Sequence, residues 1–101
     1  MEKRPTYDLD RIKVLISDPA TCIITKTGRN DAVTLGYVTE EDIVGRVHAL
    51  RPSELYKTME SDNMPGLWQD VYRTDDPNGN RLYIKLQEAR DKGIIVSFKK
   101  R

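Results

Sequence analysis

A change of period at Pro52 limits the folds open to this chain more than any other feature of its sequence. Before Pro52, apolar residues recur every three or four positions, as on one face of a helix. After it they alternate with polar residues, as Leu82, Ile84 and Leu86 do, which is the pattern of a strand. Helices followed by hairpin-linked strands form an α+β fold. We therefore expect one antiparallel β-sheet with helices packed on one of its faces.

Two segments before Pro52 carry the start signals of helices. Asp8 can cap a helix over residues 9–16, which ends before the next proline. Thr39 and Asp42 form a capping-box pattern at the start of a second helix, which ends before Pro52. The residues expected on the buried stripe of this second helix are Ile43, Val47 and Leu50.

The region between these helices has weaker signals. Residues 22–24 are apolar but too few to assign. Gly28-Arg29-Asn30-Asp31 predicts a turn that leads into a short helical piece around residues 32–36. Cys22 is the only cysteine, so no disulfide can form within the chain, which favours the cytosol, and we interpret this residue as a small buried hydrophobe.

Four segments after Pro52 have the composition and alternation of strands. They are residues 55–59, 68–73, 82–87 and 94–98. Between the second and third, the run of turn-forming residues 75–80 predicts a hairpin. We expect Asp75 and Asp76 at its tip, where their carboxylates would repel RNA, and Lys99 as the start of a solvated basic tail.

The charge balance excludes a strongly basic protein. The chain has 17 Lys and Arg against 16 Asp and Glu, a net charge of +1, so any affinity for RNA must come from a local patch. Its 101 residues fit one domain over residues 1–101. No segment is long and apolar enough for a membrane span, and we expect a cytoplasmic protein with no membrane partner.

The second face of the predicted sheet is polar. If Leu82 and Ile84 face the helices, Tyr83 and Lys85 face the other way, because strand side chains alternate. Such a face can bind a phosphodiester with its cations and stack bases on its rings. Cleavage of RNA by its own 2′-hydroxyl needs a base, donors for the phosphate oxygens and an acid, but requires no metal. No metal-site spacing or phosphate loop is present in the sequence, so we expect no metal and no cofactor.

The residues that could carry protons are few. His48, the only histidine, lies beside the apolar stripe of its helix among charged neighbours, and we interpret it as a solvated residue. A neutral lysine needs a pKa shift of ~3 units, which takes burial or nearby cations. A tyrosine donor beside a charged lysine clamp costs less, and both arrangements stay open. Trp68 is interpreted as a packing residue of the sheet.

Four blocks of sequence resemble a known protein family. They are LYKTM at 55–59, WQDVYR at 68–73, LYIK at 82–85 and IVSFK at 95–99. In order and spacing they resemble the MqsR (motility quorum-sensing regulator) toxin family, and the WQDVYR block is the most distinctive. Residues 1–4 and 35–36 also resemble this family, so the likeness covers most of the chain.

The resemblance implies a RelE-like fold and the toxin of a type II toxin–antitoxin system. Such a toxin is an endoribonuclease, an mRNA interferase that cleaves single-stranded mRNA at GC-containing triplets independently of the ribosome. It thereby blocks translation and growth, and a cognate antitoxin neutralises it. Carried over by position, the catalytic residues are Lys57 and Tyr83, as proton carriers or charge stabilisers, and Gln69, which orients the phosphate. We add Arg73 and Lys85 as RNA contacts.

The placement of Gln69 carries a geometric condition. If Asn78-Gly79 formed a two-residue turn, Gln69 would lie opposite Glu88, on the face away from Tyr83. The site hypothesis therefore requires an odd-length loop or a bulge, which shifts the register by one residue.

Two other functions are weighed against the toxin. A catalytically inactive relative could act as a protein or nucleic-acid binding co-regulator, which the near-neutral charge would suit. A small-molecule enzyme would need a phosphate loop, a ligand set or a nucleophile motif that this sequence lacks. The first two differ in whether Lys57 and Tyr83 reach one phosphate.

Overall fold

The computed structural model describes residues 4–101, which form three α-helices, a short 3₁₀ helix and a five-stranded sheet. The elements in chain order are α1 (Leu9–Ile16), β1 (Cys22–Ile24), α2 (Lys26–Thr34), α3 (Glu40–His48), η1 (Pro52–Glu54), β2 (Leu55–Glu60), β3 (Trp68–Asp75), β4 (Arg81–Ala89) and β5 (Lys92–Lys100). The α+β class predicted from the sequence is confirmed.

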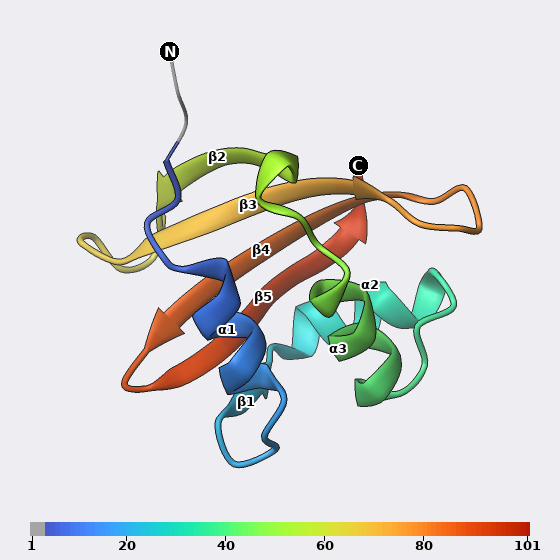
Figure 1. The fold of residues 1–101 in the computed structure, drawn as a ribbon, viewed down its shortest axis with the longest axis horizontal. Coiled ribbons are helices and arrows are strands. Elements are labelled where there is room, and N and C mark those ends of the chain that lie inside the picture. Colours follow the sequence, from blue (N-terminus) through green and yellow to red (C-terminus); the bar gives the residue numbers. More distant parts are fainter. Residues whose placement is uncertain (1–3) are drawn as a thin grey trace.

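The sheet has the strand order β1-β5-β4-β3-β2 (Figure 1). Strands β2 to β5 form the expected antiparallel meander. The short strand β1, which the sequence did not allow us to assign, pairs in parallel with β5 and makes the sheet mixed. The strand β2 at the other end pairs only with β3 among the described strands, so one of its edges is open.

Helix α1 packs closely on the sheet for reasons visible in its sequence. The Asp8 side chain accepts from the backbone N–H of Asp10 at 2.9 Å, as predicted for a cap. The residues that this helix buries are Leu9, Ile12, Leu15 and Ile16. Gly93 on β5 permits the contact, since a Cβ there would lie 2.8 Å from Ile16 Cγ2. The predicted first helix is therefore confirmed, with its close packing explained by a glycine in the strand below.

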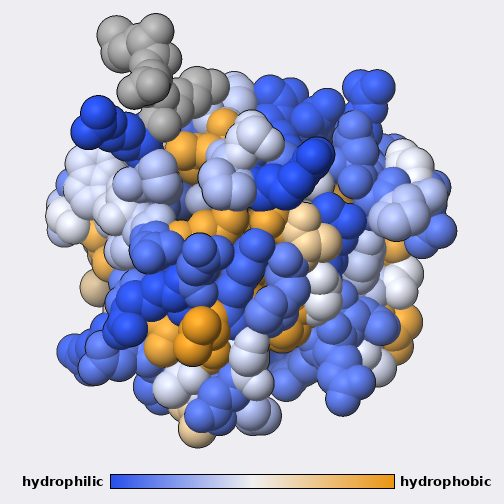
Figure 2. All heavy atoms as spheres, in the orientation of Figure 1, coloured by the Kyte–Doolittle hydropathy of each residue, from blue (hydrophilic) through white to orange (hydrophobic). Residues whose placement is uncertain are grey.

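Helix α3 also begins as predicted. The Thr39 hydroxyl accepts from the backbone N–H of Asp42, and the Asp42 carboxylate accepts from that of Thr39, which completes the capping box. Its stripe is buried as expected, since Ile43 and Val47 are both 0% exposed. Leu50, which was expected on the same helix, is also buried but lies two residues beyond the end of α3. Together α1 and α3 cover one face of the sheet, and Figure 2 shows this side with a largely hydrophilic surface and small separate apolar areas.

Helix α2 corrects the prediction of a turn at residues 28–31. Thr25 caps it by accepting from the N–H of Gly28 at 3.0 Å, and the helix then runs through the expected turn residues. Gly28 is needed for close approach rather than for a turn, because a Cβ would lie 3.0 Å from Thr25 Oγ1 and 3.4 Å from the Val96 carbonyl oxygen. Thr25 also donates from its N–H to the Ile95 carbonyl, so α2 lies along the β5 edge where β1 ends.

The β3–β4 hairpin satisfies the register condition. Asp75 pairs with Arg81, which leaves five residues, 76–80, in the loop instead of a two-residue turn. In this register Arg73 lies opposite Tyr83. Gln69, four residues before Arg73 on β3, therefore points to the same face as Tyr83.

Asp76 at this loop corrects a second expectation, because it is 6% exposed and does not project as a repelling charge. Its carboxylate accepts from the N–H groups of Asn78 and Asn80 at 2.9 and 2.8 Å, and from the Tyr37 hydroxyl at 2.6 Å. Burial raises the pKa of Asp76, but these hydrogen bonds outweigh burial and hold it below its usual value. Asp75 is exposed, as expected.

The segment before α1 is tied to the same face of the sheet as the helices. The Asp70 carboxylate on β3 is fully buried and accepts from the backbone N–H groups of Thr6 and Tyr7, both at 2.9 Å. The Tyr7 hydroxyl donates to the Trp68 carbonyl at 2.7 Å.

Across residues 4–101, no helix is long and apolar enough to cross a membrane.

Candidate functional site

The candidate site lies on the sheet face away from α1 and α3. Strand pairing places Lys57, Val71 and Lys85 in one row across β2, β3 and β4, because Lys57 pairs with Val71 and Val71 with Lys85. The next row contains Arg73, Tyr83 and Lys99. Residues paired across strands point to the same face, so five polar side chains of these rows share one surface.

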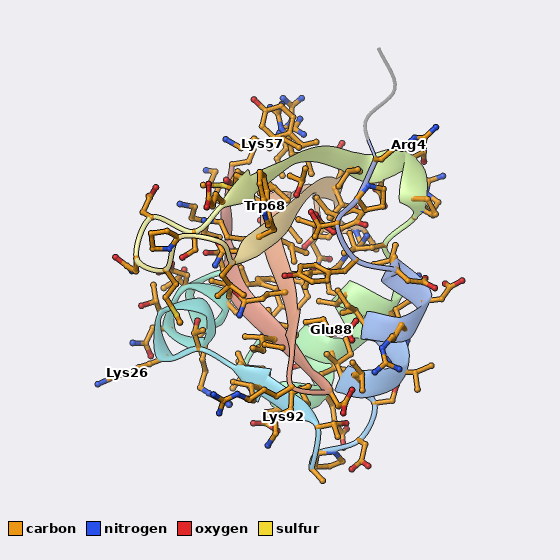
Figure 3. The ribbon with its side chains drawn as sticks, turned by 90° about the vertical axis from the view of Figure 1, so that its left-hand side faces the viewer. Arg4, Lys26, Lys57, Trp68, Glu88 and Lys92 are labelled. Carbon is orange, nitrogen blue, oxygen red and sulfur yellow. The ribbon has the colours of Figure 1, made fainter. Side chains whose placement is uncertain are left out.

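These rows are close enough to act on one phosphate. From the usual spacings within a sheet, the Cα atoms of Lys57 and Lys85 are about 10 Å apart, and those of Lys57 and Tyr83 about 12 Å apart. Lysine and tyrosine side chains each span about half of this separation. Figure 3 shows Lys57 on the edge strand β2. Glu88 of β4 lies on the helix side of the sheet, where its carboxylate pairs with Arg11 of α1 at 2.7 Å.

Lys85 lies at the centre of this charge cluster. Burial lowers the pKa of its ammonium group below the usual 10.5, and the neighbouring charges of Lys99 and Lys57 lower it further. The negative charge of Asp62, in the loop between β2 and β3, raises the pKa of Lys85 and so opposes these effects. The two conditions set for a more easily neutralised lysine, burial and nearby cations, are therefore both present at Lys85.

Tyr56 is a member of the site that the sequence reasoning missed. The β2–β3 register shifts between Leu55 and Lys57, so Tyr56 is the extra residue of a bulge. The centre of its ring lies 4.4 Å from Arg73 Cζ and 5.7 Å from Lys57 Nζ. A bulge redirects a side chain relative to regular alternation, which is why the period of the sequence gave no signal for it.

Lys99 is the second residue that was missed. Lys99 is exposed, as predicted, but it does not begin a tail, because β5 continues to Lys100 and Lys99 pairs with Tyr83. Its Nζ lies 5.1 Å from the centre of the Tyr83 ring. The alternation of Val96 and Phe98 with Ser97 and Lys99 could have extended the predicted strand to Lys99.

Gln69 lies on the same face but apart from the tyrosine. It is 7% exposed, and its Nε2 donates to Gln87 Oε1 at 3.1 Å. From strand spacings, its Cα is about 8 Å from that of Lys57 and about 14 Å from that of Tyr83. The structure thus gathers Lys57, Lys85 and Tyr83 around one area and places Gln69 beside it, in an amide pair.

Three other residues singled out from the sequence lie outside the site. Trp68 is 42% exposed, so its interpretation as a packing residue is wrong. His48 is exposed on α3, with its Nε2 2.8 Å from the Ser17 hydroxyl, as interpreted. Cys22 is partly buried on β1, where burial and the charge of Glu40 raise the pKa of its thiol.

The geometry defines a class of small α+β protein with a cationic, tyrosine-bearing sheet face. Residues 4–100 match a family model described as "Motility quorum-sensing regulator, toxin of MqsA". No curated protein matches the chain. Because the match spans nearly the whole chain, the chain belongs to the MqsR toxin family. It is therefore the toxin component of a toxin–antitoxin system, and its partner is an antitoxin.

Proposed function

We propose that this toxin is a metal-independent endoribonuclease that cleaves single-stranded messenger RNA without the ribosome and so blocks translation and growth. The observation that supports this most is the pair of adjacent rows on the open sheet face, Lys57 with Lys85 and Arg73 with Tyr83. These side chains combine phosphate-binding cations with a group that can donate a proton. An mRNA substrate also places the protein in the cytoplasm.

In the proposed reaction, the RNA supplies its own nucleophile. The 2′-hydroxyl loses its proton and attacks the neighbouring phosphorus, and the bond from phosphorus to the 5′ oxygen breaks. The leaving 5′ oxygen takes up a proton, so the products end in a 2′,3′-cyclic phosphate and a 5′-hydroxyl. Lys57 and Tyr83 transfer these protons or stabilise the developing charge, while Arg73 and Lys85 bind the phosphate oxygens.

Lys99 joins these phosphate-binding residues in our proposal. It lies across from Tyr83 and, with Lys57, lowers the pKa of Lys85. Crowded cations bind a phosphate well because the phosphate relieves their mutual repulsion. The repulsion among Lys57, Lys85 and Lys99 therefore favours binding of the substrate phosphate next to Tyr83.

Gln69 orients the phosphate and its adjoining nucleotide. It forms an amide pair with Gln87 one row beyond Lys85, and amide groups can hydrogen-bond to base edges as well as to phosphate. Tyr56, held beside Arg73, offers a ring on which a base can stack. A base-contacting surface of this kind beside the phosphate site would allow the proposed preference for GC-containing triplets.

The test is cleavage of a defined single-stranded RNA by the purified protein in excess EDTA. We expect the protein to cut, and Lys57→Ala and Tyr83→Phe each to lower the rate by about 10²–10⁴-fold, the usual contribution of a general acid or base. Lys26→Ala, an exposed lysine on α2, is the matched control and should cut at the parent rate.

Each outcome decides between the proposals. Loss of activity in both site variants, with 2′,3′-cyclic ends in the parent reaction, supports the nuclease. Cutting that requires a metal, or equal activity in the variants, contradicts the mechanism. If the parent protein cuts none of a varied set of RNAs, the alternative holds: a catalytically inactive relative that acts as a binding co-regulator, which the net charge of +1 would suit.

A further inference from the structure

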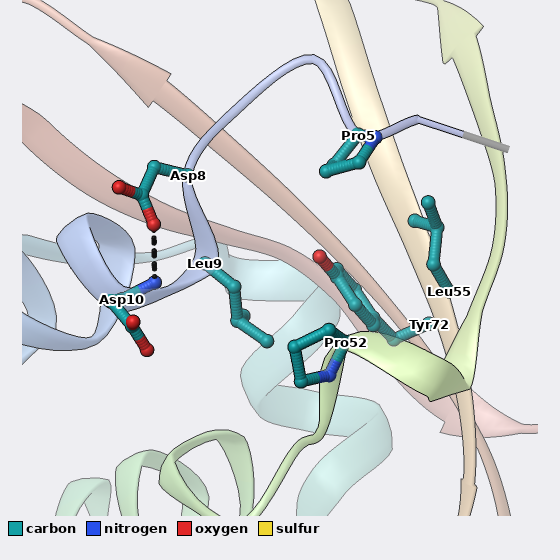
Figure 4. Close-up of a pocket in the computed structure, with 7 residues that line it drawn as sticks. All are labelled: Pro5, Asp8, Leu9, Asp10, Pro52, Leu55 and Tyr72. Atoms are coloured by element: carbon teal, nitrogen blue, oxygen red, sulfur yellow. Dashed lines mark hydrogen bonds between the residues drawn. The ribbon is translucent and has the colours of Figure 1, made fainter.

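A pocket lies on the opposite side of the sheet from the candidate active site. It has a volume of about 270 Å³ and opens between the segment before α1, the start of α1, η1 and the β2–β3 pair (Figure 4). The residues of its apolar walls are Pro5, Leu9, Pro52 and Leu55. Nothing in the proposed cleavage reaction uses this pocket, because its lining faces the helices and not the rows that contain Lys57 and Tyr83.

Tyr72 gives the pocket a polar group. Its side chain is 1% exposed, and within residues 4–101 its hydroxyl makes no hydrogen bond. Figure 4 shows this hydroxyl pointing into the space between Pro5 and Leu9. A hydroxyl that faces a cavity and makes no hydrogen bond within the protein is available to a ligand as donor or acceptor.

Two carboxylates set the charge of the pocket. Asp8 and Asp10 both line it. One Asp8 oxygen, Oδ1, caps α1 by accepting from the Asp10 N–H at 2.9 Å, while Oδ2 has no hydrogen-bond donor among the described residues. Burial, followed by the charges of Asp70 and Asp8, raises the pKa of Tyr72 to about 12, which reflects the same negative surroundings. The tyrosine therefore stays neutral, and the pocket favours a positive ligand.

We propose that this pocket binds a small organic cation, an ammonium or guanidinium group on a short apolar stem. The cation pairs with Asp8 and Asp10 at the opening, and the stem packs against the proline and leucine walls. The volume is just below the usual range of about 300–1,000 Å³ for small-molecule sites, so the ligand is a small one. A polar group at the far end of the stem would reach the Tyr72 hydroxyl.

Hexylamine is a suitable probe, because it combines an ammonium group with an unbranched apolar stem. We would titrate it into isotope-labelled full-length protein and follow backbone amide signals by NMR, with hexanoate and hexan-1-ol as controls of equal length. The expected result is a saturable shift of signals from the pocket-lining residues with hexylamine, weakened at high salt. Hexanoate should produce no such shift, and hexan-1-ol should bind at least threefold more weakly.

The decisive variant is Asp8→Asn. Asparagine caps a helix about as well as aspartate, so this change removes the charge and keeps α1 intact. We expect it to weaken hexylamine binding at least threefold and to leave hexan-1-ol binding unchanged. Equal binding of hexylamine and hexan-1-ol, unchanged binding in Asp8→Asn, or an absence of saturable shifts in the pocket would each overturn the proposal. None of these readouts depends on RNA cleavage.

Discussion

The two faces of the β3–β4 pair show how alternating residues of the same strands take on different tasks. On β4, the residues Leu82, Ile84 and Leu86 are fully buried against the helices. The residues between them, Tyr83 and Lys85, point to the other face and remain partly exposed beside other cations. One face thus supplies stability through apolar burial, and the other supplies charge and hydrogen-bonding groups.

This contrast shows that substitutions one residue apart should affect different properties. A side chain of the helix face contributes to the free energy of unfolding through packing and burial. A partly exposed side chain on the open face, such as Tyr83 or Lys85, contributes less to that free energy and can serve binding or catalysis. The comparison fails if stability and activity change together at neighbouring positions of β4.

The largest expected effect is on stability, at the helix face. Ile84→Ala should lower the free energy of unfolding by about 2–5 kcal/mol, since it removes a fully buried side chain and leaves a cavity. Its neighbour Tyr83→Phe should change that free energy by less than about 0.5 kcal/mol, because it removes only a hydroxyl from the open face.

Urea unfolding of both variants and the parent protein measures this difference. RNA cleavage by the same three proteins, assayed under conditions where all of them are folded, measures the effect of each substitution on activity. The two-face comparison is contradicted if Tyr83→Phe destabilises the fold as much as Ile84→Ala does.

The next effect concerns Asp76, which stabilises the loop that sets the register. Asp76→Ala should lower the free energy of unfolding by about 1–3 kcal/mol at pH 7, because it leaves the N–H groups of Asn78 and Asn80 without their acceptor. Since the folded-state pKa of Asp76 lies below its usual 3.8, the stabilisation is present above that value and is lost as the pH falls through the folded pKa.

Denaturation at pH 7 and again below pH 3.8 tests both parts of this prediction. The difference between the parent and Asp76→Ala should shrink at the lower pH. A difference that stays constant would mean that the Asp76 charge does not stabilise the loop.

The smallest expected effect is a change in the titration of Lys85. Its ammonium group should lose its proton below the usual pKa of 10.5 in an NMR titration of lysine side chains. Lys99→Met should raise the midpoint because it removes a repelling charge, and Asp62→Asn should lower it further because it removes an attracting one. A lower midpoint in Lys99→Met, a higher midpoint in Asp62→Asn, or no response to either change would show that the cluster is not arranged as described.

The elements with strong local signals were predictable from the sequence. Asp8 and the Thr39–Asp42 box begin the two predicted helices, because their side chains satisfy backbone N–H groups at a helix start. The alternation at residues 82–87 placed one face of β4 correctly. The need for an odd-length loop was also predictable, and the five residues between Asp75 and Arg81 meet it.

The features that depend on tertiary contacts were not predictable. Gly28 suggested a turn, but its role is the close approach of α2 to the β5 backbone, which local sequence does not encode. Asp76 looked like an exposed charge until Tyr37, 39 residues away, supplied a hydrogen bond. In the site, the bulge that places Tyr56 beside Arg73 breaks the alternation on which the sequence argument relied.

The most direct test of the account is to map where RNA binds. A single-stranded RNA with 2′-O-methyl groups lacks the attacking hydroxyl, so it should bind without being cut, and its contacts can be followed by NMR on the parent protein. We predict that the shifted signals fall on the open face, at Lys57, Arg73, Tyr83, Lys85 and Lys99. Shifts confined to α1, α3 or the Tyr72 pocket would contradict the assignment of the open sheet face as the RNA site.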